Sequence, residues 1–135
     1  MAIFNNLGKY RDFGLLIIRL GLGAMFIYHG LPKLTGGIKT WEEVGSATKY
    51  AGIHFWPVFW GLLSACVETF GGFLLIIGLG FRAVCLLLLI NMIVAALFLF
   101  GQGADIGKAA EAIEDGVVFA GLLFVGPGKY SVDKR

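Results

Sequence analysis

The hydrophobic residues of this 135-residue chain fall into four long stretches separated by short polar segments. The stretches cover about residues 13–31, 56–79, 83–100 and 109–125. Each is close to the ~17–25 residues that a helix needs to cross ~30 Å of hydrocarbon. We therefore predict an all-α protein, a four-helix transmembrane bundle that forms one integral membrane domain over residues 1–135.

The fourth stretch is the least apolar of the four. Glu111, Glu114 and Asp115 crowd its start, and the uninterrupted apolar part covers only residues 116–125. We still predict a crossing here, with the acidic turn at the outer interface of the membrane.

The first loop, residues 32–55, carries the pattern of a short helix. Thr40 followed three residues later by Glu43 matches a capping box, and Gly52 suits the C-terminal stop. We predict a short interfacial helix in this first outer loop. The pattern leaves open whether this helix covers the mouth of the bundle as a lid or only connects two crossings.

Composition agrees with a membrane protein and excludes several classes of site. The chain is 58% hydrophobic and 15% charged, whereas soluble domains are about 45–50% apolar and about 25% charged. Its net charge of +2 requires no nucleic-acid partner. Cys66 and Cys85 form no CxxC motif, and no haem, iron–sulfur or zinc spacing occurs, so we predict no metal and no covalent cofactor.

Basic residues give the orientation. Four crossings place both termini on one side of the membrane. That side carries six Lys and Arg residues, and the other side carries four. Because an excess of Lys and Arg marks cytoplasmic segments, we predict that both termini are cytoplasmic. The six residues on that side are Lys9, Arg11, Arg82, Lys129, Lys134 and Arg135.

Two charges lie inside the apolar stretches, Arg19 in the first and Glu68 in the second. A charge within a bilayer costs ~3 kcal/mol or more, so it usually faces a partner or a water-filled cavity. Arg19 shares a helix face with Gly23, and Glu68 shares one with Gly72; small residues let helices approach closely. Arg19 lies ~9 Å and Glu68 ~16 Å from the cytoplasmic ends of their helices, a difference that two side chains bridge. We predict a buried pair that either fixes helix register or binds an anionic or carbonyl ligand.

Further polar residues surround this predicted pair. Asn91 lies alone in the third stretch, where it would bond to a neighbouring helix or contact a ligand. An outer polar cluster should form where the first helix ends and the fourth begins, either as salt bridges or as a vestibule to the inner pair. Its members are His29, Lys33, Glu111, Glu114 and Asp115.

Three segments together resemble one family. They are RLGLGAMFIYHGLPKL (19–34), ETFGGFLLIIGLGFRA (68–83) and GPGKYSVD (126–133), with the acidic start of the fourth helix before the last. In this order the chain resembles the DoxX family of small four-helix bacterial membrane proteins. The positions that match the family's polar pattern are Arg19, His29, Lys33, Glu68, Arg82 and Glu114.

The resemblance implies a bacterial inner-membrane location and an association with membrane oxidoreductase systems, among them the related DoxD subunit of thiosulfate:quinone oxidoreductase. The first functional hypothesis is therefore a subunit or partner of a membrane redox system, with a quinone or small anion at a buried Arg19–Glu68 site. Such a protein would be an oxidoreductase-associated subunit rather than a stand-alone enzyme, and no catalytic residue is assigned. Its partners would be membrane lipids and soluble or membrane redox proteins.

Two alternatives stay open. The chain could be a non-catalytic membrane protein that binds lipid or assists a partner protein. A small transporter or proton path is disfavoured, because four helices without an internal repeat leave little room for alternating access. A homo-oligomer would weaken that objection.

Overall fold

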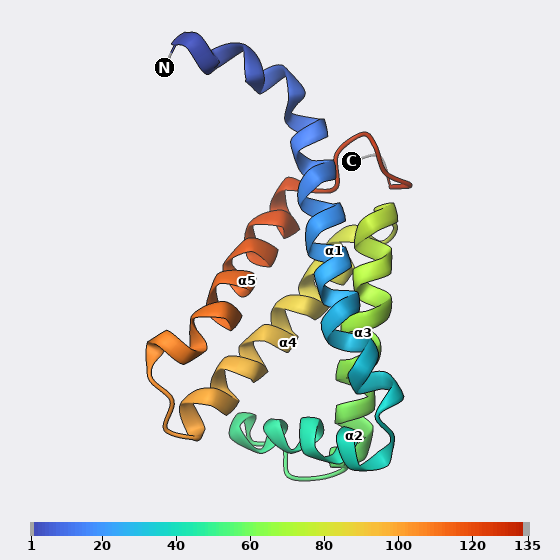
Figure 1. The fold of residues 1–135 in the computed structure, drawn as a ribbon, viewed down its shortest axis with the longest axis vertical. Coiled ribbons are helices and arrows are strands. Elements are labelled where there is room, and N and C mark those ends of the chain that lie inside the picture. Colours follow the sequence, from blue (N-terminus) through green and yellow to red (C-terminus); the bar gives the residue numbers. More distant parts are fainter. Residues whose placement is uncertain (1, 134–135) are drawn as a thin grey trace.

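The computed structural model describes residues 2–133, and within them every regular element is a helix. The all-α class is therefore confirmed. Lys134 and Arg135, which the charge argument counts, lie outside the described residues. The elements are η1 (Ala2–Tyr10), α1 (Arg11–Thr35), α2 (Ile38–Gly45), η2 (Ser46–Ala51), α3 (Pro57–Ile77), α4 (Phe81–Gly101) and α5 (Ile106–Val125), shown in Figure 1.

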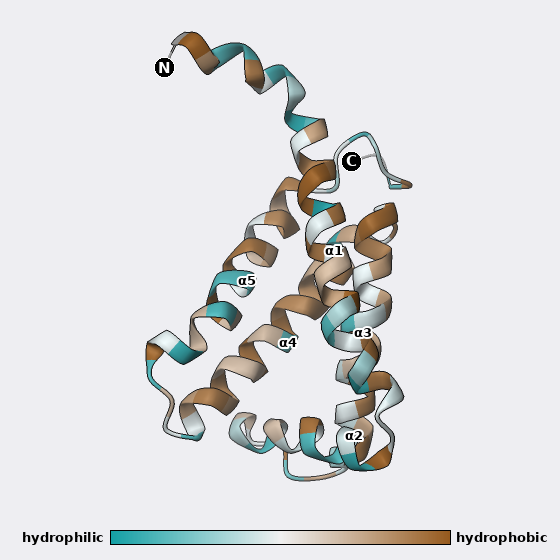
Figure 2. Cartoon of the chain, in the orientation of Figure 1, coloured by the Kyte–Doolittle hydropathy of each residue, from teal (hydrophilic) through white to brown (hydrophobic). Residues whose placement is uncertain are grey.

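Helices occupy the four predicted stretches, but they differ in their fitness to cross a membrane. Three helical segments of the described chain are long and apolar enough: Ile3–Thr35, Pro57–Ile77 and Phe81–Gly101. Helix α5 has 20 residues, yet Figure 2 shows hydrophilic patches in its first half, where its acidic residues lie. A crossing by α5, and with it the four-helix bundle, stays a prediction.

The helices form two pairs. Helix α1 packs along α3, and α4 packs along α5. The two pairs lie together at the end where both termini are found and diverge toward the other end (Figure 1). Apolar side chains hold the two pairs together: the rings of Phe26 in α1 and Phe119 in α5 lie 5.2 Å apart, within a buried cluster that includes Leu75, Phe81 and Leu88.

Glycines set the distance between α1 and α3. A Cβ atom added to Gly23 would lie 2.5 Å from the carbonyl oxygen of Gly72, and one added to Gly72 would lie 2.6 Å from the carbonyl oxygen of Gly23. Real side chains do not approach backbone so closely, so the two helix backbones meet here only because both residues are glycine. This contact fixes which residues of α1 face which residues of α3.

The segment between α1 and α3 bridges the diverging ends of the two pairs. Helix α2 packs on α3, and η2 reaches α4. The predicted capping box is wrong, because α2 begins at Ile38 and the Thr40 hydroxyl donates back to the Gly36 carbonyl oxygen at 3.3 Å. Gly52 ends η2 with a left-handed φ of 87°, as its predicted role as a stop requires. The short helix is present, and its position at a membrane interface stays a prediction.

Candidate functional site

Arg19 is buried near the termini and bonds only to backbone. Only 1% of the surface of this residue is exposed. Nε donates to the Leu75 carbonyl oxygen at 2.9 Å and Nη2 to that of Ile76 at 2.6 Å, while Nη1 donates to Pro127 at 3.2 Å and Tyr130 at 2.9 Å. The carbonyls in the last turn of a helix lack helical partners and carry partial negative charge. The end of α3 and the C-terminal tail therefore stabilise the guanidinium without a carboxylate.

The predicted pair of Arg19 with Glu68 is wrong. Among the described residues the ion pairs within 4 Å join other partners, and Arg19 lies level with Leu75. Glu68 is seven residues away from that level, which is ~10 Å along a helix. The separation exceeds the ~7 Å expected from the sequence, and backbone carbonyls rather than a side chain bond to Arg19.

The C-terminal tail held by Arg19 closes this end of the molecule. The Val132 amide donates to the Ile77 carbonyl oxygen at 3.0 Å. The Asp133 carboxylate accepts from the Gly80 amide at 3.0 Å and from the Phe81 amide at 2.8 Å. Asp133 thus satisfies two amides at the start of α4, in the manner of an N-cap. We call this assembly of Arg19, the end of α3 and the tail the closed end.

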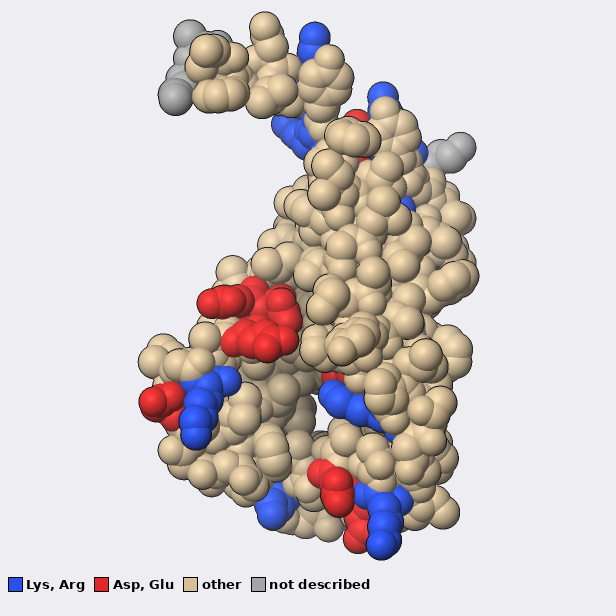
Figure 3. Space-filling view, viewed as in Figure 1, with Lys and Arg blue, Asp and Glu red and all other residues tan. Residues whose placement is uncertain are grey.

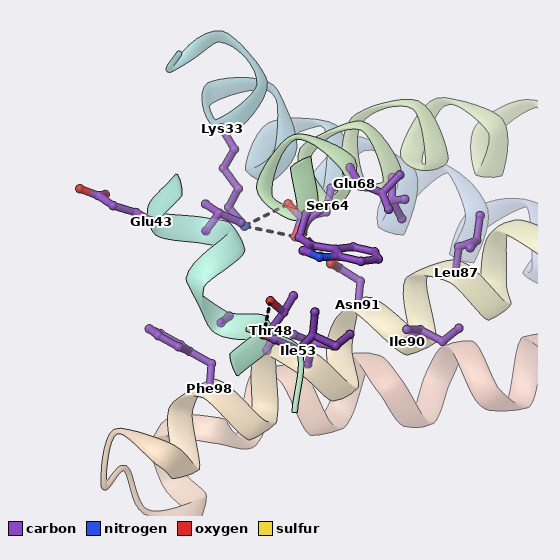
Figure 4. A pocket seen from close by; sticks show the side chains of 17 residues that line it. Lys33, Glu43, Thr48, Ile53, Ser64, Glu68, Leu87, Ile90, Asn91 and Phe98 are labelled. Atoms are coloured by element: carbon purple, nitrogen blue, oxygen red, sulfur yellow. Dashed lines mark hydrogen bonds and ion pairs between the residues drawn. The ribbon is translucent and has the colours of Figure 1, made fainter. Parts of the chain in front are cut away.

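Glu68 has side-chain partners from two other helices. It is 4% exposed, and both of its oxygens accept from Lys33 Nζ of α1 at 3.1 Å. Asn91 Nδ2 of α4 donates to Glu68 Oε1 at 2.9 Å, and Ser64 Oγ donates to Asn91 Oδ1 at 2.7 Å (Figure 4). A continuous polar chain of Lys33, Glu68, Asn91 and Ser64 therefore links α1, α3 and α4. We call it the polar chain.

The polar chain lines a cavity of about 350 Å³ between α2, η2, α3 and α4. In Figure 4 Lys33 and Glu43 lie at one end of the cavity and Leu87 at the other. Its remaining walls are mostly apolar, and a few convergent polar groups in an apolar pocket of this size are typical of small-molecule sites. Apolar lining residues include Val44, Ile53, Leu63, Val67, Ile90 and Phe98.

The predicted outer polar cluster is divided in the structure. Figure 3 shows an acidic patch over the first half of α5, which carries Glu111, Glu114 and Asp115. His29 Nε2 lies 3.9 Å from Glu111 Oε1, and both side chains are exposed, so this contact is at most a weak ion pair. Lys33 is not part of this group, because its ammonium bonds to Glu68. No metal-binding group of three His, Cys, Asp or Glu residues occurs within residues 2–133.

Sequence reasoning missed the bond between Lys33 and Glu68, although a signal existed. Lys33 follows Arg19 and Gly23 on the face of α1 that packs on α3, at whole-turn spacings. Gly30 lies on that face one turn before Lys33, and a Cβ added to it would lie 2.7 Å from Glu68 Cβ. The side chain on this face that comes within reach of Glu68 is therefore Lys33, because Arg19 lies about three turns before Gly30.

Long apolar helices, together with a cavity that carries polar groups on one wall, are typical of a helical membrane protein. Comparison with known proteins identifies the family. Residues 14–101 match the DoxX family model, and because this is more than half of the chain, the protein belongs to the DoxX family. An uncharacterized protein of Haemophilus influenzae is 31% identical over 137 residues, covering 97% of this chain and 96% of the relative. No solved structure matches the chain. The matched residues include Lys33, Glu68 and Asn91.

Proposed function

We propose that this DoxX protein is a bacterial inner-membrane subunit or partner of a membrane redox system, and that a quinone or small anion binds in the cavity beside Glu68. The family's association with membrane oxidoreductases supports the redox role. The observation that carries the site is the polar chain, which places Lys33, Glu68 and Asn91 on one wall of an otherwise apolar cavity. In this proposal Arg19 is left out of the site, because its guanidinium forms four hydrogen bonds to backbone carbonyls at the closed end.

The residues of the polar chain have separate roles in this proposal. Lys33, whose side chain is 37% exposed, donates to an oxygen of the ligand. Glu68 holds or releases a proton beside it, and Asn91 orients the carboxylate by its bond to Oε1. A quinone would supply the two-electron chemistry, and in this proposal the electrons pass to or from a partner protein of the redox system.

The experiment that tests this site is native mass spectrometry of the full chain extracted gently from its own membrane. We expect a quinone or a small anion to co-purify with the wild-type protein and to be lost from Glu68→Gln. Glu111→Gln is the matched control, because Glu111 is an exposed carboxylate outside the cavity. If neither ligand co-purifies, or the bound ligand is retained equally in both variants, the proposed site is wrong. Lipid or a protein partner alone would favour the non-catalytic alternative.

We also propose that both termini lie in the cytoplasm. Both chain ends lie at the same end of the molecule (Figure 1), and Lys9, Arg11, Arg82 and Lys129 belong to the segments found there. A fusion of alkaline phosphatase to the C-terminus should then be inactive, while the same fusion after Gly103, in the loop between α4 and α5, should be active. The reverse pattern would invert the orientation.

A further inference from the structure

A second, apolar groove continues the cavity beside Glu68. It has a volume of about 210 Å³ and lies between α3 and α4. Val67 and Leu87 line both spaces. The additional walls of the groove include Phe70, Gly71 and Val84. The two spaces are therefore neighbours that share walls, and they differ in chemistry.

The direction of the groove follows from the order of these residues. Along α3, the walls run from Glu68 to Gly71 and Leu74, and along α4 they run from Asn91 back to Leu87 and Val84. Both series approach the turn between α3 and α4, away from Lys33 and from η2. A molecule that occupied both spaces would have its polar end at the polar chain and its apolar end in the groove.

The charges of the polar chain already cancel. Lys33 Nζ lies 3.1 Å from both oxygens of Glu68, so a free anion would meet no net positive charge here and would lie beside a buried carboxylate of like charge, which is unfavourable. Hydrogen-bond donors of Lys33 and Asn91 remain available. The Lys33 ammonium has three N–H groups, and the Asn91 amide has two, only one of which donates to Glu68. These groups suit an uncharged head that carries hydrogen-bond acceptors.

Resting on the proposed function, we infer that the ligand of this site is an uncharged amphiphile, with an acceptor-bearing head beside Lys33 and Asn91 and a single apolar tail in the groove along Gly71. This assigns a tail-binding subsite and selects a tailed molecule over a free small anion. The head class includes a quinone ring and an ester. A phospholipid is disfavoured, since its phosphate would meet Glu68 and its second chain has no place in the groove.

Gly71 is a position at which the tail subsite can be narrowed, because a Cβ atom fits there between α3 and α4. A Cβ added to Gly71 would lie 3.5 Å from Val84 Cγ1 and 3.7 Å from Leu88 Cδ1, which are ordinary contacts. Gly71→Leu should fill the groove. Gly21→Leu is the matched control, because Gly21 lies mid-helix in α1 with nothing within 4 Å of an added Cβ.

The test uses the full chain in phosphatidylcholine nanodiscs and two probes that share a dimethoxymethylbenzoquinone ring, one with a decyl chain and one without. Gly71→Leu should weaken the decyl probe roughly tenfold, or about 1.4 kcal/mol, and leave the ring without a chain unchanged. Gly71→Ala should show a smaller loss in the same direction, and Gly21→Leu should show none. Partition of the decyl probe into lipid is the same for every variant, so it cancels. Isothermal titration calorimetry measures the dissociation constants, and thermal unfolding checks each fold.

The outcomes separate this inference from the proposed function. If Gly71→Leu weakens both probes equally, or neither, the tail subsite is wrong while binding of the ring still supports the cavity. If thiosulfate displaces the ring from the wild-type protein, the occupant is an anion and the inference is overturned. If neither probe binds to the wild-type protein, the inference and the quinone form of the proposed function both fail. Should Gly71→Leu not fold, the comparison of Gly71→Ala with Gly21→Ala decides.

Discussion

The closed end around Arg19 and the cavity around Glu68 accommodate a buried charge in opposite ways. Arg19 directs its four hydrogen bonds to backbone carbonyls of α3 and the tail. Glu68 is bonded to side chains, and its counter-charge, Lys33, is 37% exposed beside a cavity. A charge held by backbone is fixed by the fold, whereas a charge held by side chains can exchange partners. The two sites therefore suit different roles: Arg19 stabilises the structure, and Glu68 is free to meet a ligand.

The largest effect that would sharpen this comparison is expected from Arg19→Leu. Removing the guanidinium leaves four buried or partly buried carbonyls without donors, so the free energy of unfolding should fall by about 3 kcal/mol or more. Denaturant titration in detergent, followed by circular dichroism, measures it. Arg82→Leu is the control, because Arg82 also donates to carbonyls at a helix end, those of Leu123 and Phe124, but is exposed. It should lose no more than about 1 kcal/mol; equal losses would contradict the special role of Arg19.

The sequence predicted that Arg19 and Glu68 are unusual, but not what each one bonds to. The buried position of both follows from charge, hydrophobic context and small-residue faces. The partners of Arg19 are backbone atoms, and a search among side chains cannot find them. The turn glycines Gly78 and Gly80 and the breaker at residues 126–128 did mark helix ends at that level, where unpaired carbonyls are expected.

The helices themselves were largely predictable, because long apolar stretches determine them almost alone. The exact ends of the helices were not predictable: α1 begins at Arg11 rather than Phe13, and α3 ends at Ile77 rather than Leu79. The cavity was not predictable either. It depends on how far α3 and α4 diverge and on where η2 lies between them, and neither is encoded in a local pattern.

The second prediction concerns the contact that sets the register of both charges. Gly23→Val places a branched side chain against the Gly72 carbonyl oxygen, 2.5 Å from the position of Cβ. The backbones of α1 and α3 must then separate, at a cost of about 2 kcal/mol. Because Arg19 and Lys33 lie on the same helix at either side of Gly23, both sites should be weakened together. Stability and probe binding should fall in this variant, and neither should change beyond ~0.5 kcal/mol in Gly21→Val, which meets open space.

The third prediction tests whether the pair at the cavity is more important for binding than for stability. Glu68→Gln leaves Lys33 without its counter-charge, but the ammonium is partly exposed, so the expected loss of unfolding free energy is only about 1–2 kcal/mol. The double variant Lys33→Met with Glu68→Gln removes both charges and should recover most of that loss. Ligand binding should be lost in both variants, as measured with the benzoquinone ring. Restored binding in the double variant would show that the charges only fix the helices.

The smallest effect is expected at the edge of the closed end, from Asp133→Ala. The carboxylate accepts from the Gly80 and Phe81 amides at 3.0 and 2.8 Å, and loss of an N-cap typically costs about 1 kcal/mol. The tail remains attached through Arg19, so the loss should be local. Hydrogen exchange should therefore quicken at the amides of Gly80, Phe81 and Val132 while those beside Glu68 keep their rates. If the amides around the cavity also exchange faster, the closed end and the cavity are one cooperative unit, and the division of roles between Arg19 and Glu68 does not hold.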